Sequence, residues 1–550
     1  MTNSDPSRVP DLLHPNPLRR IAPDSTEVAI SLAFAGGSSG GLFSEALENS
    51  LIAPSSWDGS LFANDLFLPR LVSESFRLPG AADAPALCTK HLLKLLVHPP
   101  ADPAVVEFRR GILRELIGSR ELRAQLLLLY TRLRQVRQLL ENTGGGRNWD
   151  PNRRQLDILS AVKATIEVMG GGFHGATSGL ERLHRFAVRV RDSEAYRSLC
   201  DLVQFDSRLA ILNLTVGVGA DGRIRGFELV SVNENTASPF VSSPVRRWMA
   251  KVELFFRGYR FSDGEVMARL IDAVFSGVQG DLVAMIQLYG DLELYLGMLG
   301  FKDRVEAQGL SLCLPELVDA DSPRELEGLF NPLLLLGGTK PVPCNILTDH
   351  LTGTVLVTGP NSGGKTRLLQ ALGIAQLMAQ SGLLVPARSA KMALSPALVV
   401  SLIEVVKADQ AEGRLGMELI RIRQLFERLP PGAVVLLDEL CSGTNPSEGE
   451  EIFELVVTTL SRLRPQVFIT THFLAFAARL ERERKIDDLD FLQVELGPER
   501  RATFQFVPGV ARTSLAGHAA ERLGVTRDQL LSLVDRNTAN YERTHGVGGA

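Results

Sequence analysis

The most informative stretch of the sequence is Gly359-Pro-Asn-Ser-Gly-Gly-Lys-Thr366, which fits the pattern GxxxxGK[ST]. Glycines in this pattern let consecutive backbone N–H groups turn toward one polyphosphate, and the following helix N-terminus adds its positive dipole end. Lys365 is expected to reach the β- and γ-phosphates, and the Thr366 hydroxyl is expected to bind Mg²⁺. The predicted phosphate-binding residues are Gly359, Pro360, Asn361, Ser362, Gly363, Gly364, Lys365 and Thr366.

Two acids and a histidine follow later apolar runs. Asp438 and Glu439 come directly after Val434–Leu437, and His472 closely follows Val467–Thr470. Open α/β sheets bind ligands beyond the C-terminal ends of their strands, so we expect these side chains near the phosphate loop. We predict that Asp438 binds Mg²⁺, that Glu439 orients the attacking water, and that His472 hydrogen-bonds the γ-phosphate. With the loop, they predict an ATPase that uses ATP and Mg²⁺.

The elements that must position these residues are short strands alternating with helices. Thr354–Thr358 predicts a strand before the loop, and Arg367–Gln380 predicts an amphipathic helix after it. The alternation runs from Asn331 to about Val507 and is typical of a parallel α/β sheet.

The sequence upstream of this region is mainly helical in pattern. Helical periodicity begins near Leu87, whereas Glu27–Ala35 is expected to form a buried strand. Ile211–Val232 contains two β-rich runs around Asp221–Gly222, which predicts a hairpin.

Composition and charge exclude several classes of protein. The chain has 550 residues, 45% of them hydrophobic, and 59 basic against 63 acidic residues give a net charge of −4. A protein steered to nucleic acid by a globally basic field is therefore excluded. Five scattered cysteines and no transmembrane-length apolar run favour the cytoplasm and no membrane partner. The nine histidines show no familiar ligand spacing, so no transition-metal site is expected.

Four segments carry a family resemblance. GPNSGGKT, LMAQSGLLVPA, LLDELCSGTNPSEG and ITTH resemble the ATPase domain of the MutS family in residues and in spacing. GTNPSEG is most similar to the second bacterial lineage of this family, whose members often carry a C-terminal Smr nuclease. HLLKLLVHPPADPAVVEFRRGILREL at 91–116 resembles the start of the family's lever, and DLELYLGMLGF at 291–301 resembles its return helix.

The resemblance implies an ABC-type α/β P-loop NTPase domain, C-terminal to a mostly α-helical lever domain with a small β-rich clamp insertion. The expected divisions are an N-terminal segment of unknown role over 1–86, the lever over 87–325 with its clamp around 205–240, the ATPase domain over 326–530, and a tail over 531–550. Mismatch-recognition, connector and Smr domains are not expected in this chain.

The function implied is ATP hydrolysis that drives clamp and lever movements on mismatched, branched or otherwise non-standard duplex DNA, in repair or recombination control. Family ATPase domains work as homodimers, each closing a signature serine over its partner's nucleotide. Leu415 and Gly416 stand where that serine and a threonine are expected, so hydrolysis is expected to be slow or completed differently. Two alternatives stay open, namely a MutS-like ATPase acting on ribosomes or structured RNA, and an ABC-like motor acting on a protein.

Basic residues in and after the predicted clamp are candidates for nucleic-acid contact. Arg223 and Arg225 alternate onto one strand face, as a grip on a phosphate backbone requires. Arg246, Arg247 and Lys251 are interleaved with aromatic residues, which suits phosphate contact and stacking. A second arginine-dense stretch, with eight arginines against three glutamates, runs from 107 to 137.

Overall fold

The computed structural model describes the chain outside a few gaps. The described residues are 9–36, 40–80, 86–142, 151–209, 214–218, 224–229, 263–402, 414–441, 445–498, 501–512 and 524–545. The chain forms two compact units, one of 1–54, 72–303 and 381–383, and the other of 55–71, 304–380 and 384–550. The boundaries expected from the sequence at 86, 325 and 530 stay a prediction.

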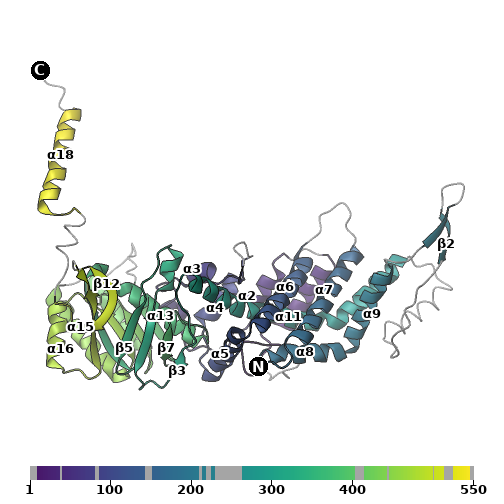
Figure 1. Cartoon of the computed structure of the whole chain (residues 1–550), viewed down its shortest axis with the longest axis horizontal. Helices are drawn as coiled ribbons and strands as arrows, with labels where there is room; N and C mark the ends of the chain where they lie inside the picture. The colour runs from purple at the N-terminus through teal and green to yellow at the C-terminus, as the bar shows by residue number, and fades with distance from the viewer. Residues whose placement is uncertain are drawn as a thin grey trace. The chain divides into compact units, whose positions relative to one another are not determined.

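The first unit is helical. Helices α6, α7 and α8 pack against one another in sequence order, with α9 against α7 (Figure 1). Its elements are α1 (Pro23–Phe34), α2 (Leu42–Glu48), α4 (Thr89–Val97), α5 (Pro103–Gly118), α6 (Arg120–Glu141), α7 (Pro151–Gly172), α8 (Glu181–Asp192), α9 (Glu194–Leu209), β1 (Leu214–Val218), β2 (Ile224–Leu229) and α11 (Asp263–Ala307).

Helix α11 is the core of this unit. Its stretch Met267–Ala307 is long and apolar enough to cross a membrane, although 94% of its apolar 18-residue segment is buried inside the protein. The sequence analysis was therefore wrong that no such run exists, and burial against other helices explains why this one is apolar on every side. Leu12 N–H donates to Asp291 of α11 over 3.0 Å, and the Arg20 guanidinium pairs with the same carboxylate. Part of the N-terminal segment thus docks on the core helix.

The strand expected over Glu27–Ala35 is instead helix α1. Pro23 occupies the first turn, where its missing N–H is tolerated. The buried residues of α1, namely Thr26, Ile30, Ala33 and Phe34, recur at helical spacing, while Val28 is 62% exposed. A short apolar run does not by itself distinguish a strand from a helix, which explains the error.

The hairpin predicted in the helical region forms. Strand β1 pairs antiparallel with β2, with Leu214 opposite Leu229. The turn Asp221–Gly222 lies outside the described residues. The use of this hairpin as a clamp stays a prediction.

The second unit contains the sheet that was predicted. Its six strands lie in the order β12-β11-β6-β10-β9-β8, all parallel except the edge strand β12, and a second sheet has the order β3-β7-β4-β5. The strands are β3 (Glu316–Leu317), β4 (Arg324–Leu329), β5 (Cys344–Thr348), β6 (Gly353–Thr358), β7 (Ser389–Met392), β8 (Leu398–Ser401), β9 (Val434–Leu437), β10 (Gln466–Thr470), β11 (Leu489–Leu496) and β12 (Ala502–Pro508).

Helices complete the second unit. They are η1 (Gly59–Leu61), α12 (Pro332–Leu336), η2 (Asn361–Gly363), α13 (Lys365–Gln380), α14 (Arg414–Arg428), α15 (Pro446–Leu460), η3 (Ser461–Leu463), α16 (Leu474–Glu483) and α18 (Arg527–His545). Helix α3 (Leu68–Ser75) begins within the segment 55–71 and ends in the first unit. The segment 55–71 is fastened to the second unit by hydrogen bonds from Trp57 Nε1 to Ser395 O, 2.9 Å, and from Leu402 N to Asp65 Oδ1, 2.7 Å.

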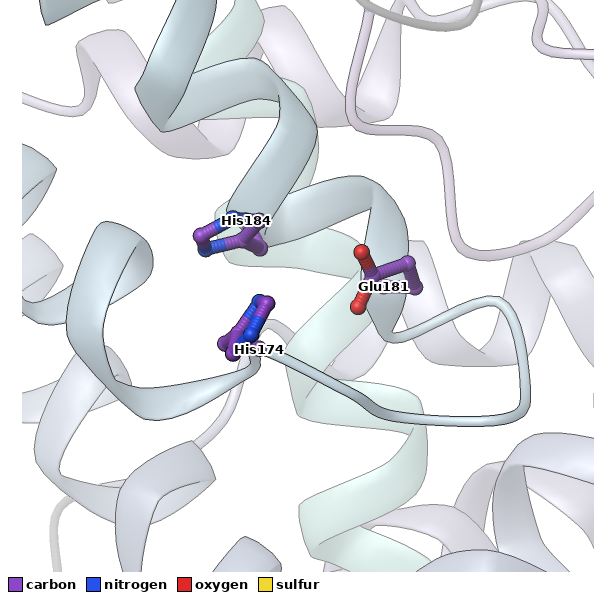
Figure 2. Close-up of side chains that lie close together, drawn as sticks. All are labelled: His174, Glu181 and His184. Carbon is purple, nitrogen blue, oxygen red and sulfur yellow. The ribbon is translucent and has the colours of Figure 1, made fainter.

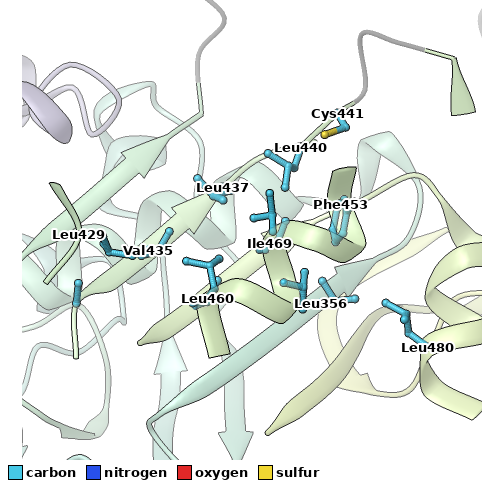
Figure 3. Close-up of a cluster of buried hydrophobic side chains, with 14 of the residues drawn as sticks. Leu356, Leu429, Val435, Leu437, Leu440, Cys441, Phe453, Leu460, Ile469 and Leu480 are labelled. Carbon is cyan, nitrogen blue, oxygen red and sulfur yellow. The ribbon is translucent and has the colours of Figure 1, made fainter. Parts of the chain in front are cut away.

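A cluster of buried apolar side chains fills the space between strands β6, β9 and β10 and helices α15 and α16 (Figure 3). It includes Leu356, Val435, Phe453, Ile469 and Leu480. Helix α13 differs from the expected amphipathic helix because every residue from Leu368 to Gln380 is buried. At Gly373 a side chain would meet both Leu436 of β9 and Leu66, so the helix has protein on two sides.

Candidate functional site

The phosphate loop follows strand β6 and rests against strand β11. Gly359 and Gly364 have φ angles of 137° and 86°, which L side chains rarely adopt. A Cβ at Gly359 would lie 2.7 Å from a methyl group of Val494, and one at Gly363 would lie 2.8 Å from the same methyl. The glycines therefore allow the loop both its backbone conformation and its close approach to the neighbouring strand.

Lys365 lies at the start of α13 with its ammonium turned back on the loop. Lys365 Nζ donates hydrogen bonds to Gly359 O over 2.9 Å and to Pro360 O over 3.2 Å. Burial lowers the pKa of Lys365, and the nearby carboxylates of Glu439 and Asp438 oppose that shift. These contacts hold a cation beside the loop's N–H groups, where phosphate oxygens can replace the two carbonyls as its partners.

Asp438 lies between two threonine hydroxyls. Thr366 Oγ1 donates to Asp438 Oδ2 over 2.5 Å, and Thr470 Oγ1 donates to Asp438 Oδ1. Strand β10 pairs in parallel register with β6 on one side and β9 on the other, and this order brings the three residues together. Thr470 was not among the predicted site residues, although its place at the end of an apolar strand just before His472 is a signal in the sequence.

Glu439 and His472 form a pair beside Asp438. His472 Nε2 lies 2.6 Å from Glu439 Oε1, and both side chains are more than one third exposed. The Glu439 N–H donates to Thr470 Oγ1 over 2.9 Å, and Glu439 has a left-handed φ of 54°. The Glu439 carboxylate is therefore accessible to water and in contact with the His472 imidazole.

Thr366 and Asp438 are suited to binding Mg²⁺. Hydroxyl and carboxylate oxygens are the ligands that this ion prefers, and Mg²⁺ is usually bound by one or two such groups together with phosphate oxygens and waters. Thr366 and Asp438 supply this donor set in direct contact with each other. The two residues predicted to bind Mg²⁺ are thus adjacent.

Comparison with known proteins agrees with this geometry. Residues 355–533, which include the loop, both acids and His472, match the family model of MutS domain V. Curated relatives that carry the MutS2 name match between 39% and 70% of the chain. The chain therefore carries a domain of the MutS family over residues 355–533.

Each of these curated relatives is matched over less than half of its length. Endonuclease MutS2 of Streptococcus mutans is 32% identical over 216 residues, 39% of this chain and 27% of that protein. Endonuclease MutS2 of Thermomicrobium roseum is 25% identical over 405 residues, 70% and 47% of the two chains. That of Thermus thermophilus is 31% identical over 240 residues, 43% and 31%. The chain spans between about a quarter and a half of the length of these relatives.

A pocket of about 360 Å³ adjoins the phosphate loop of the MutS domain. Phe504 and Phe506 of β12 and Lys340 line it together with Asn361 and Arg367. Phe504 has a left-handed φ of 62° and is 43% exposed, so an aromatic face is held at the pocket in an uncommon backbone conformation. Sequence analysis did not assign these aromatics to the site, because they lie more than 130 residues beyond the loop.

A second pocket, of about 370 Å³, lies on the Asp438 and Glu439 side of the site and is also lined by α14. Within α14, Glu418 accepts a hydrogen bond from the Cys441 N–H. Leu415 and Gly416, which replace the family's serine and threonine, lie in the first turn of this helix. Neither has a hydroxyl, and the slow or differently completed hydrolysis expected from this departure stays a prediction.

Most of the residues predicted to contact nucleic acid lie outside the part of the chain that the structure describes. Arg223, Arg246, Arg247 and Lys251 lie outside the described residues, and Arg225 lies in β2. Their role stays a prediction.

Several arginines of the stretch 107–137 are engaged in contacts within the protein, so fewer of them can contact nucleic acid than the composition indicated. Arg109 is buried and donates to Leu13 O over 3.1 Å, and Arg123 pairs with Asp303 over 2.9 Å. Arg137 pairs with Glu141 over 2.9 Å. Several of these guanidinium groups therefore stabilise the helical unit and do not form one basic surface.

Proposed function

We propose that this MutS-family protein hydrolyses ATP and uses the nucleotide state to move its lever and clamp on DNA. The observation that carries the proposal is the convergence of Lys365, Thr366, Asp438, Glu439 and His472 at the ends of three adjacent strands. Those five residue types supply a phosphate cation, a metal-binding pair and a carboxylate with a basic partner.

Each residue then has a role in hydrolysis. Lys365 and the loop N–H groups bind the phosphates, and Thr366 with Asp438 holds Mg²⁺, which when bound offsets the negative charge of the phosphates. Glu439 orients a water molecule and accepts its proton as the water oxygen bonds to the γ-phosphorus and the bond to the leaving ADP oxygen breaks. His472 holds the Glu439 carboxylate and can turn to the γ-phosphate.

The pocket beside the phosphate loop is a candidate binding site for the base of the nucleotide. Phe504 and Phe506 offer aromatic faces there, and Lys340 and Arg367 add positive charge. Stacking on an aromatic side chain is a general way to bind a nucleobase. We propose this pocket as the adenine site.

DNA is the proposed partner, and non-standard duplex in repair or recombination control is the proposed substrate. Family membership supports this assignment, as do the hairpin β1–β2 and the basic residues in and after it. A homodimer formed through the ATPase units is proposed from the same kinship. The cytoplasm is the proposed location because all five cysteines are free thiols.

The test is binding of the full chain to matched duplex, mismatched duplex and four-way-junction DNA, each with no nucleotide, ADP or ATP, at several salt concentrations. We expect affinity to change with nucleotide and to fall steeply with salt, because each phosphate contact releases counterions. Replacing Arg246, Arg247 and Lys251 by alanine is expected to reduce the salt slope by about one for each phosphate-binding cation removed. Tighter binding to ribosomes or structured RNA, or no binding to nucleic acid at low salt, would overturn the DNA assignment.

A further inference from the structure

Three potential metal ligands lie together in the helical unit, and none of them belongs to the nucleotide site. His174 lies in the loop after α7, while Glu181 and His184 lie on the first turn of α8 (Figure 2). One ligand atom from each side chain lies within 4.8 Å of the others. Their spacing matches no familiar motif, which is why no metal was expected here from the sequence.

The tautomer of His184 is fixed by the backbone. His184 Nδ1 lies 2.8 Å from Gly170 O, and a carbonyl oxygen only accepts hydrogen bonds, so Nδ1 carries the proton. Nε2 of the neutral ring then keeps its lone pair. A histidine bound to a metal typically donates its other N–H to a carbonyl or carboxylate in this way.

The other two ligands have accessible lone pairs. The rings of His174 and His184 are 4.7 Å apart at an angle of 49°, and His174 is exposed. Glu181 Oε2 accepts the Gly175 N–H over 3.0 Å, and its Oε1 has a guanidinium only at 4.0 Å, from the exposed Arg185. The carboxylate is therefore oriented by the loop and still has coordination capacity.

The loop that carries His174 is held in place by the rest of the unit. Glu115 of α5 accepts the N–H groups of Thr177 over 2.7 Å and Ser178 over 3.0 Å. Phe173, the residue before His174, is fully buried. Because the backbone is anchored on both sides of His174, side-chain rotation alone must close the site. Metal–ligand bonds of about 2.0–2.1 Å in a tetrahedral site place ligand atoms roughly 3.3 Å apart.

We propose that His174, Glu181 and His184 bind a divalent transition metal of the Zn²⁺ class, with water completing the coordination. Two imidazoles and one carboxylate are a donor set that Zn²⁺ accepts readily, and imidazole also suits Co²⁺ and Ni²⁺. The bound ion ties the α7–α8 loop to helix α8 and stabilises the helical unit.

The experiment uses the full chain, stripped with chelator and kept free of nucleotide. Co²⁺ is titrated while its visible absorption is followed, Zn²⁺ is then added, and thermal unfolding is measured with and without Zn²⁺. We expect a single equivalent of Co²⁺ with absorption typical of a low-coordinate site, and its displacement by Zn²⁺. Zn²⁺ at about a hundred times its dissociation constant is expected to raise the Tm by roughly 5 °C. Asp438→Asn is expected to leave all of this unchanged, because Asp438 is not one of the three ligands.

Two ligand variants and a matched control complete the test. His174→Gln and His184→Gln are expected to weaken Zn²⁺ binding by more than the roughly 10- to 100-fold that loss of an outer partner causes. Both variants should melt like the parent in chelator, since His174 is exposed and His184 is only half-buried. His98→Gln changes an exposed histidine outside the cluster and is expected to bind as the parent does. Equal Zn²⁺ affinity in parent and ligand variants, or no binding by the parent, would overturn the proposal.

Discussion

Thr366 Oγ1 donates a hydrogen bond to Asp438 Oδ2 over 2.5 Å, although the two residues are 72 positions apart in the chain. One follows the phosphate loop and the other follows strand β9, and β10 lies between their strands. Without a cation, the Thr366 hydroxyl donates one of the hydrogen bonds that the Asp438 carboxylate can accept. When Mg²⁺ is present, both oxygens can turn to the ion, so the contact keeps the two ligands at the right separation.

The first prediction concerns Lys365. Lys365→Ala removes a buried cation whose present partners are loop carbonyls, and a charged hydrogen bond contributes about 1.5–3 kcal/mol. We expect ATP affinity to fall roughly 10- to 100-fold, measured with a fluorescent ATP analogue. Lys485→Ala, at an exposed lysine of the same unit, should bind normally. Unchanged affinity in Lys365→Ala would remove Lys365 from the phosphate site.

The second prediction separates binding from turnover. Glu439→Gln keeps the size of the side chain but cannot accept a proton, so kcat is expected to fall by about 10²–10⁴ while ATP affinity stays within a few fold. The check is steady-state phosphate release beside equilibrium ATP binding. Glu427→Gln, at an exposed acid on α14, is the control. Turnover at the parent rate would show that Glu439 is not the base.

The third prediction concerns Thr470, which the structure adds to the site. Its hydroxyl donates to Asp438 and accepts the N–H of Glu439. Thr470→Val preserves shape and removes both bonds, so we expect turnover to fall about tenfold and the Mg²⁺ concentration for half-maximal activity to rise, since losing a ligand's outer partner weakens metal affinity 10- to 100-fold. Thr470→Ser should restore both quantities. If valine and serine behave alike, the hydroxyl has no positioning role.

The fourth prediction concerns stability against pH in the helical unit. Burial lowers the pKa of His91 to about 3, with the charge of Arg20 adding to the shift, and His91 Nε2 has no hydrogen-bond partner. Below the ordinary pKa of about 6.5 the unfolded chain binds a proton that the folded chain does not. The free energy of unfolding should therefore fall as the pH drops from 6.5 toward 3, with His91 contributing up to about 1.4 kcal/mol per pH unit.

Urea unfolding at pH 7, 6, 5 and 4 measures this slope. His91→Gln removes the titrating group, so its slope should be shallower than that of the parent. His98→Gln removes an exposed histidine and should leave the slope as it is. Parallel curves for the parent and His91→Gln would contradict the prediction.

The sequence predicted which residues gather beside the phosphate loop better than it predicted the helical unit, because the signals for these residues are local. The loop, Asp438, Glu439 and His472 each adjoin a short apolar run, and parallel pairing of those runs is enough to bring them together. Thr470 stands in the ITTH segment, but its contact with Asp438 and the place of the aromatic pair of β12 depend on the register of neighbouring strands. The His174 cluster required a loop conformation fixed by a distant residue, Glu115.

Burial explains the errors at helices α13 and α11. The periodicity of apolar residues indicates which side of a helix or strand packs against protein. It gives no such indication where the element is surrounded by protein on all sides. Helix α13 is buried nearly throughout, and α11 is apolar enough to resemble a membrane span. Helix α1 was mistaken for a strand because its short apolar run is compatible with either element.

The left-handed backbone of Glu439 has a consequence for the evolution of this site. For a residue with a Cβ this conformation costs roughly 1–2 kcal/mol, whereas glycine adopts it freely. Glycine at this position would give a more robust fold and remove the only carboxylate that contacts His472 within the described chain. On the role proposed for Glu439, a change to glycine would stabilise the backbone and abolish turnover, so selection for turnover would be what keeps a glutamate here.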